Sequence, residues 1–142
     1  MTNLRIPDDR LADLTAFRRA LHQTPETGFE VQETARRIAG RLRALGLEVT
    51  NGVGRTGIVA SLRFGDSGRA IGLRADMDAL SITEANEFEH RSTVVGKFHG
   101  CGHDGHSTSV GSCDCQKTSL KRIYSLNLCF AWGTEQSPRA GL

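Results

Sequence analysis

The sequence predicts a single α/β domain. Two segments repeat apolar residues at helical spacing, and residues 58–64 alternate apolar and polar side chains as a half-buried strand does. A length of 142 residues corresponds to about one domain. We expect two helices on one side of a sheet that is built from strands near 47–50, 58–64 and 70–74.

The first helix is expected to begin at Pro7-Asp8-Asp9, where an aspartate would cap free backbone N–H groups. His22 follows at its end, where a hydrogen-bonding or positive side chain is favourable, so we interpret His22 as structural rather than catalytic. The apolar stripe that should face the core contains four residues. They are Leu11, Leu14, Phe17 and Leu21.

The second helix, over 31–45, has the clearest amphipathic pattern of the chain. Arginines cover much of its polar surface, and Gly46 is well placed to end it. Its apolar residues step by four, three, four and three positions. They are Val31, Ala35, Ile38, Leu42 and Leu45.

Strands are expected on both sides of a glycine-rich turn at 51–57. This turn contains neither a GxGxxG pattern nor a Walker lysine, so we do not interpret it as a phosphate-binding loop. A hairpin-type turn at 65–68 should then connect the strand over 58–64 to the next strand, over 70–74.

Two carboxylates, Asp76 and Asp78, follow the third predicted strand. At this spacing they face one way if the chain stays extended, and ligand sites of open α/β sheets collect beyond the carboxyl ends of strands. Either aspartate would then bind a metal or orient a histidine ligand. The alternative is a plain solvated turn.

The strongest chemical signal is the segment His99–His106, which reads HGCGHDGH. Imidazole, thiolate and carboxylate are common ligands of zinc and similar ions, and glycines let the backbone bend around an ion. His99, Cys101 and His103 would share one side of an extended segment. His103 and His106 would meet instead if a helix began there. We take Cys101 and His103 as the metal-ligand pair; the alternative is a glycine-rich surface turn with incidental histidines.

Composition argues against two classes of partner. The net charge is +2 and no basic cluster interleaves with aromatic residues, which leaves nucleic-acid binding without support. No apolar run approaches the roughly 20 residues that cross a bilayer, so we expect no membrane partner. The first nine residues are polar and lack a signal-peptide core, which favours a cytoplasmic protein.

Six motifs occur in an order that resembles a known family. They are His22, Pro25-Glu26, Gly28-Phe29-Glu30, Arg74 to Leu80, Phe88 to Arg91 and Cys101 to His106. Together they resemble the N-terminal part of the metal-dependent amidohydrolases that include hippurate hydrolase, N-acyl-amino-acid amidohydrolases and auxin-conjugate hydrolases. The resemblance departs from the family pattern at Ser81, where proline is usual, and at Gly100, where alanine is usual.

The resemblance implies part of a metallo-exopeptidase-like catalytic domain with helices packed on a mixed sheet. It implies hydrolysis of the amide bond of a small-molecule N-acyl amino acid. Two divalent ions, zinc or manganese, would activate a water in each complete family member. By position, Cys101 and His103 resemble two of the family's metal ligands, and Asp78 resembles a supporting carboxylate of the catalytic centre.

The family's later motifs are not found in this sequence. Those motifs are a Pro-Ala-Glu-Glu segment, two later histidines and a lid domain, whereas the last histidine here is His106. Glu135 alone falls close to the position of the ligand glutamate. We therefore interpret residues 1–110 as the N-terminal part of the catalytic domain and expect the chain alone to be inactive.

Residues 111–142 are interpreted as a divergent, frame-disrupted tail. Gly111 to Gln116 reads GSCDCQ, and one choice of codons for it yields Ala-Ala-Ala-Thr-Ala when shifted by one base. That is the small-residue helix expected at this point of the family. Leu126 to Phe130 then resembles the family's next strand, back in frame.

The sequence is also compatible with two other functions. One is a small metal-binding module without catalysis, using Cys101, His103 and the pair Cys113 and Cys115, although that pair is closer together than the cysteines of structural zinc sites. The other is an interaction protein, which no specific feature supports. Metal stoichiometry and turnover separate these functions from that of an amidohydrolase.

Overall fold

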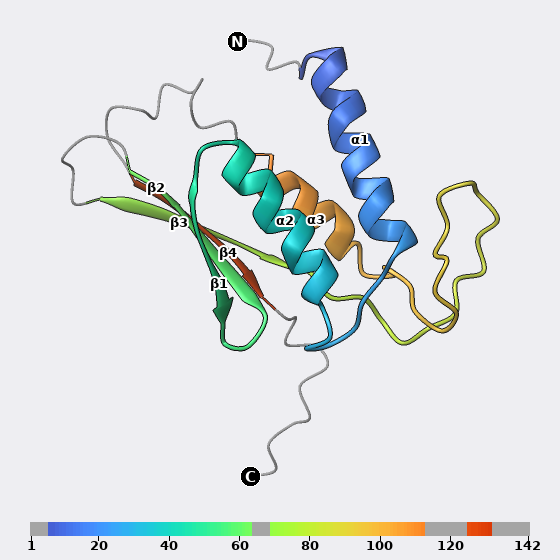
Figure 1. Ribbon diagram of the computed structural model, residues 1–142. Helices are drawn as coiled ribbons and strands as arrows, with labels where there is room; N and C mark the ends of the chain where they lie inside the picture. Colours follow the sequence, from blue (N-terminus) through green and yellow to red (C-terminus); the bar gives the residue numbers. More distant parts are fainter. Residues whose placement is uncertain (1–5, 64–68, 113–124, 132–142) are drawn as a thin grey trace.

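The computed structural model describes residues 6–63, 69–112 and 125–131 (Figure 1). Three helices and four strands form these parts of the chain. In order they are α1 (Asp8–Gln23), α2 (Gln32–Ala44), β1 (Glu48–Val53), β2 (Gly57–Leu62), β3 (Ala70–Asp76), α3 (His103–Val110) and β4 (Ser125–Ala131).

The four strands form one mixed sheet in the order β1-β2-β4-β3. β1 pairs antiparallel with β2, β2 pairs antiparallel with β4, and β3 pairs parallel with β4. The strand expected at Leu126 to Phe130 is therefore present, at the centre of the sheet. The mixed sheet and its helices confirm the predicted α/β class.

The hairpin predicted between β2 and β3 is wrong. β4 lies between these two strands, so they do not pair with each other. Parallel strands require a crossover connection, and the chain between β3 and β4 supplies one that includes α3. The proposed turn residues, 65–68, lie outside the described part of the chain.

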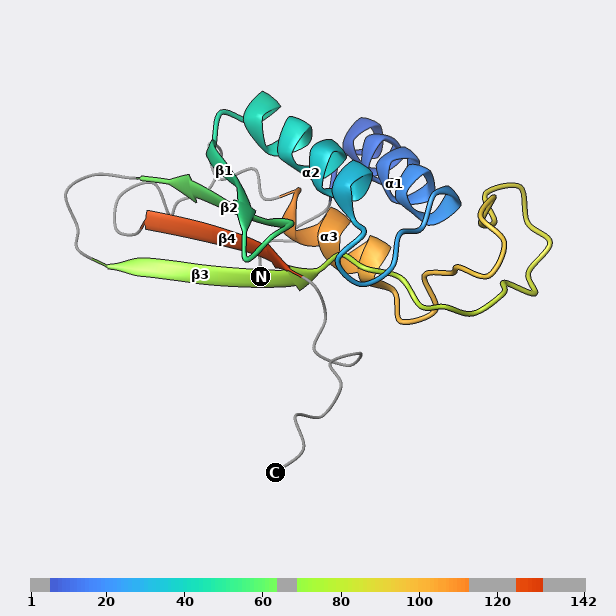
Figure 2. The ribbon, with the colours of Figure 1, turned by 60° about the horizontal axis from the view of Figure 1, so that its bottom comes forward.

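All three described helices lie on one face of the sheet (Figure 2). Helix α2 contributes to an apolar core with the inward side chains of β2 and β4. Alternate residues of a strand share a face, which is why Ile58 and Ala60 are both buried. Among the largest fully buried side chains are Ile38, Leu42, Ile58, Leu128 and Phe130.

Helix α2 matches its prediction closely. Thr34, Ile38, Ala39 and Leu42 are buried on one side, and Gly46 follows with a φ of 81°, which favours glycine. The Glu26 carboxylate accepts hydrogen bonds from the backbone N–H groups of Glu33 (3.2 Å) and Thr34 (2.7 Å). The loop residue Glu26 thus satisfies free N–H groups at the start of α2.

Helix α1 departs from its prediction in two respects. No side chain caps its start; Asp8 and Asp9 lie inside the first turn, where negative charge complements the helix dipole. The apolar stripe is buried only towards its end, because Leu21 is buried whereas Leu11 is 51% exposed.

The strand predicted near 47–50 extends to Val53. β1 continues through Asn51 and Gly52 with an irregular register before Val53 pairs with Gly57. The φ of Gly52 is 77°, a conformation that L side chains rarely adopt. The glycine-rich turn is therefore shorter than 51–57. No helix among the described residues is long and apolar enough to cross a membrane.

Candidate metal centre

The HGCGHDGH segment packs against the end of β3. α3 begins at His103, directly after Gly102, whose φ is 79°. His103 Nδ1 lies 2.8 Å from the Asp78 backbone oxygen and 3.2 Å from Asp78 Oδ1. Ser107 Oγ donates a hydrogen bond of 3.0 Å to the Asp76 backbone oxygen. The start of α3 is therefore held against residues 76–78.

The contact with Asp78 fixes the chemistry of the His103 ring. The backbone oxygen and Oδ1 of Asp78 are both acceptors, so Nδ1 carries a proton, and in the neutral form of the ring Nε2 carries the lone pair. His103 and Asp78 are both buried. In a metal-binding histidine, the ring nitrogen that does not bind the metal usually donates a hydrogen bond to a carboxylate or a backbone carbonyl.

The two alternatives for the histidines of this segment are resolved by the start of α3. His103 and His106 lie on the same helix with ring centroids 5.6 Å apart, which is the helical alternative. His99, Cys101 and His103 do not share one side, because His99 is buried and Cys101 is exposed. Cys101 lies in the turn that leads into α3.

Asp76 and Asp78 have different partners, contrary to the expectation that they face one way. Asp76 is the last residue of β3, and its carboxylate lies 2.9 Å from the Arg74 guanidinium. Asp78 lies beyond the strand and contacts His103. The extended conformation on which the expectation depended ends between them. Only Asp78 brings its carboxylate to the metal-like segment.

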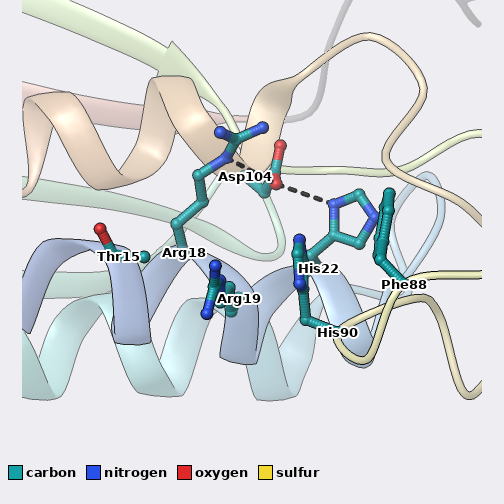
Figure 3. A pocket seen from close by; sticks show the side chains of 7 residues that line it. All are labelled: Thr15, Arg18, Arg19, His22, Phe88, His90 and Asp104. Carbon is teal, nitrogen blue, oxygen red and sulfur yellow. Dashed lines mark hydrogen bonds and ion pairs between the residues drawn. The ribbon is translucent and has the colours of Figure 1, made fainter. Parts of the chain in front are cut away.

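A second polar cluster lies on another side of the start of α3 and was not predicted. His22 Nδ1 is 2.9 Å from Asp104 Oδ2, and His22 Nε2 is 3.1 Å from Glu84 Oε1. Arg18 Nε donates to the same Asp104 oxygen at 3.1 Å. Figure 3 shows Arg18 and His22 converging on Asp104 from α1. We call these four residues the His22 cluster. Arg18, His22 and Asp104 line a pocket of about 280 Å³.

Burial and charge act in opposite directions on the carboxylates of this cluster. Burial raises the pKa of Asp104, but the hydrogen bond from His22 and the charges of His99 and Arg18 hold that pKa below its usual value. Burial also raises the pKa of Glu84, and the Ser92 N–H, Asn86 and His22 lower it further than burial raises it. Both carboxylates are thus held ionised by their partners.

His99 lies beside this cluster, with its ring centroid 6.2 Å from that of His22. Its two ring nitrogens are buried and have no hydrogen-bond partner among the residues that the structure describes. Burial lowers the pKa of His99 to about 4. His99 is therefore neutral near pH 7.

These residues fit part of a divalent-metal site. Thiolate and imidazole suit zinc, and Asp78 supports the His103 ring as metal sites require. In the ranges that the structure describes, however, no group of three or more His, Cys, Asp or Glu residues is arranged to hold an ion. Cys113, Cys115 and Glu135 lie outside these ranges. At least one further ligand is needed, since catalytic zinc normally has three protein ligands.

This chain is similar in sequence to several known hydrolases. Residues 72–113 match the sequence pattern of peptidase family M20/M25/M40. Hippurate hydrolase of Campylobacter jejuni is 41% identical over 102 residues, which cover 72% of this chain and 27% of that protein. The N-acyl-L-amino acid amidohydrolase of Geobacillus stearothermophilus is 40% identical over 107 residues, which cover 75% of this chain and 29% of that protein.

The solved structure of a dinuclear metal-binding peptidase of the M20 family from Bacillus subtilis superposes with a TM-score of 0.78 at 30% identity. The superposition covers 87% of this chain and 36% of that structure. This chain is therefore similar in sequence and in fold to part of the members of that family. The chain spans less than a third of the length of these two curated relatives.

The sequence indicates the motif, but it does not show that His103 and Asp104 contact different parts of the fold. Asp104 lies inside the motif, but the sequence pattern does not indicate its role, and nothing in the local sequence marks Glu84. A possible signal was the residue pair itself, because His22 and Asp104 both belong to motifs of the family pattern. Their contact spans 82 residues, and nothing in local spacing indicates it.

Proposed function

We propose that this chain is part of a metal-dependent hydrolase that cleaves the amide bond of small-molecule N-acyl amino acids such as hippurate. The match of residues 72–113 to the M20 family and the names of the two curated relatives support this substrate class. The single observation that carries the proposal is the contact of His103 Nδ1 with Asp78, because it presents Nε2 as a metal ligand.

We assign Cys101 and His103 as metal ligands and Asp78 as the carboxylate that orients His103. Two zinc or manganese ions, when bound, would supply Lewis-acid activation of a water and of the substrate carbonyl. Asp78 keeps the His103 proton on Nδ1 and fixes the plane of the ring. Cys101 contributes its thiolate from an exposed turn, where ions reach it from solvent.

A chimera tests the substrate class. Residues 1–110 of this chain replace the corresponding part of the Campylobacter hippurate hydrolase, and hippurate hydrolysis and bound metal are measured together. We expect a folded chimera with two ions per chain that hydrolyses hippurate, and loss of both properties in Cys101→Ala and His103→Ala. A folded chimera that binds two ions but leaves hippurate and other N-acyl amino acids intact would contradict the proposal.

Residues 1–142 alone are proposed to bind metal without efficient turnover. The described ranges supply only Cys101 and His103 from the proposed ligand set, and loss of a general base alone costs about 10²–10⁴-fold in rate. The purified chain is mixed with zinc or manganese and assayed on hippurate. Turnover at ordinary enzyme rates that is abolished by Cys101→Ala would show that residues 111–142 supply the missing groups.

We also propose that residues 111–124 are encoded in a shifted reading frame. The family match stops at residue 113, whereas β4, from Ser125, pairs with β3 over seven consecutive residues. Genomic DNA read in three frames tests this. An Ala-rich helical sequence in a neighbouring frame is expected, and its absence would contradict the interpretation.

A further inference from the structure

The start of α3 is held from two directions, by two consecutive residues. His103 contacts Asp78 beyond the end of β3, and Asp104 contacts His22 at the end of α1. Successive residues of a helix point about 100° apart, so both contacts form without distortion. The link from Asp104 to His22 spans 82 residues of sequence.

His22 is built as a bridge rather than as a surface histidine. Its two nitrogens face Asp104 and Glu84, and the side chains of all three residues are at most 8% exposed. The ring thus links the two carboxylates, and Arg18 contacts Asp104 as well, so each buried carboxylate has hydrogen-bonding partners.

The far side of the bridge orders the connection between β3 and α3. Glu84 also accepts a hydrogen bond of 2.6 Å from the Ser92 N–H and one of 2.9 Å from the Asn86 side chain. The rings of Phe88 and Phe98 lie 5.8 and 5.5 Å from the His22 ring. These contacts restrict the rotamers of His22. A shift of the His22 ring would therefore move its hydrogen-bond partners Asp104 and Glu84.

From this geometry we propose that His22 is a positioning residue for the metal-binding turn: through Asp104 it fixes the start of α3, and so the direction of His103 Nε2. This inference rests on the proposed metal centre. His22 does not itself contact the ion in this proposal. Replacing a residue that directly supports a metal ligand typically changes metal affinity by about 10–100-fold, and this range is the upper bound for a residue that acts through Asp104.

The test measures Co²⁺ affinity from the thiolate-to-cobalt charge-transfer band in chain 1–142, with Cys113 and Cys115 replaced by serine throughout. His22→Leu removes both hydrogen bonds and is expected to weaken Co²⁺ binding by about 10–100-fold. His22→Asn can keep a donor near the position of Nδ1 and is expected to remain within about threefold of the unsubstituted chain, a difference of less than 1 kcal/mol. His90→Gln changes another histidine of the same pocket and is the matched control, with unchanged affinity expected.

A double-substitution cycle separates positioning from general stability. If His22 acts through Asp104, His22→Leu combined with Asp104→Ala binds Co²⁺ no more weakly than the worse single variant. Two results would overturn the proposal without affecting the proposed metal centre. One is additive losses of Co²⁺ affinity in the double variant, and the other is unchanged Co²⁺ affinity in a folded His22→Leu chain. If His22→Leu does not fold, unchanged affinity in Asp104→Ala overturns it. Absence of the cobalt–thiolate band in the unsubstituted chain would instead overturn the metal centre, and this proposal with it.

Discussion

Two buried regions of this fold have opposite chemistry. Beneath α2 the buried side chains are apolar, and Ile38, Ile58 and Phe130 are at most 1% exposed. Between α1, α3 and the connection 77–102 the buried side chains include four ionisable ones. They are His22, Glu84, His99 and Asp104.

The difference separates what stabilises the fold from what prepares the site. Each apolar side chain beneath α2 contributes free energy of unfolding in proportion to its buried area, at roughly 25 cal/mol per Å². Burying the ionisable side chains of the polar region costs desolvation free energy, which their hydrogen bonds and ion pairs only offset. Such a region is expected to contribute defined geometry rather than net stability. It lies where the candidate metal ligand His103 enters α3.

The largest expected effect is on the apolar side. Ile38→Ala should lower the free energy of unfolding by about 2–5 kcal/mol, because it leaves a cavity at a position with 1% exposure. Urea denaturation measures this loss, and Co²⁺ affinity of the folded variant should not change. A loss below about 1 kcal/mol would mean that α2 is not packed as described.

The next effect is a pH dependence that belongs to the polar side. Burial lowers the pKa of His99 from 6.5 to about 4. Between pH 6.5 and pH 4, His99 is therefore protonated in the unfolded chain but not in the folded chain. Stability should therefore fall as pH falls from 6.5 to 4, by up to about 3 kcal/mol at 1.36 kcal/mol per unit. Urea denaturation of the metal-free chain at pH 7, 5.5 and 4.5 measures it.

A His99→Phe chain provides the control for this slope. It should lose the part of the pH dependence between 6.5 and 4, whereas Ile38→Ala should keep the full slope. Equal slopes in the His99→Phe and unsubstituted chains would show that His99 is not buried as a neutral ring.

A smaller effect is expected at the contact between the sheet and α3. Asp78→Asn should weaken Co²⁺ or Zn²⁺ binding by about 10–100-fold, equivalent to about 1.4–2.7 kcal/mol, because a neutral amide supports the His103 ring less well. Isothermal titration calorimetry measures the affinity. Asp13→Asn is the matched control: this carboxylate is largely exposed and pairs with Arg41, 2.5 Å away. Equal affinity in the two variants would remove Asp78 from the site.

The smallest effect is expected at the solvent edge of the His22 cluster. The Arg18 side chain is 56% exposed although it contacts buried Asp104. Exposed ion pairs contribute little, so Arg18→Ala should lower the free energy of unfolding by less than about 1 kcal/mol. Thermal or urea denaturation checks this. A loss as large as that of Ile38→Ala would show that the polar region stabilises the fold, against the comparison made above.

The same contrast explains what the sequence predicted. The stripe of α2 and the alternation of β2 follow fixed periods, so both elements and their buried faces were predictable. The insertion of β4 between β2 and β3 was not, because pairing partners are set by long-range packing. Cys101, His103 and Asp78 were found by residue chemistry and motif resemblance. The contacts of Asp104 and Glu84 were missed, because burial of a charge depends on partners far away in sequence.

The central claim is that Cys101 and His103 together bind a divalent ion. X-ray absorption at the zinc edge tests it most directly, in chain 1–142 with Cys113, Cys115 and Cys129 replaced by serine. We predict one sulfur scatterer at about 2.3 Å and imidazole nitrogen at about 2.0–2.1 Å. Both contributions should be lost on Cys101→Ser and His103→Ala, respectively. A zinc ion with no sulfur neighbour, or a spectrum that neither substitution changes, would contradict the account.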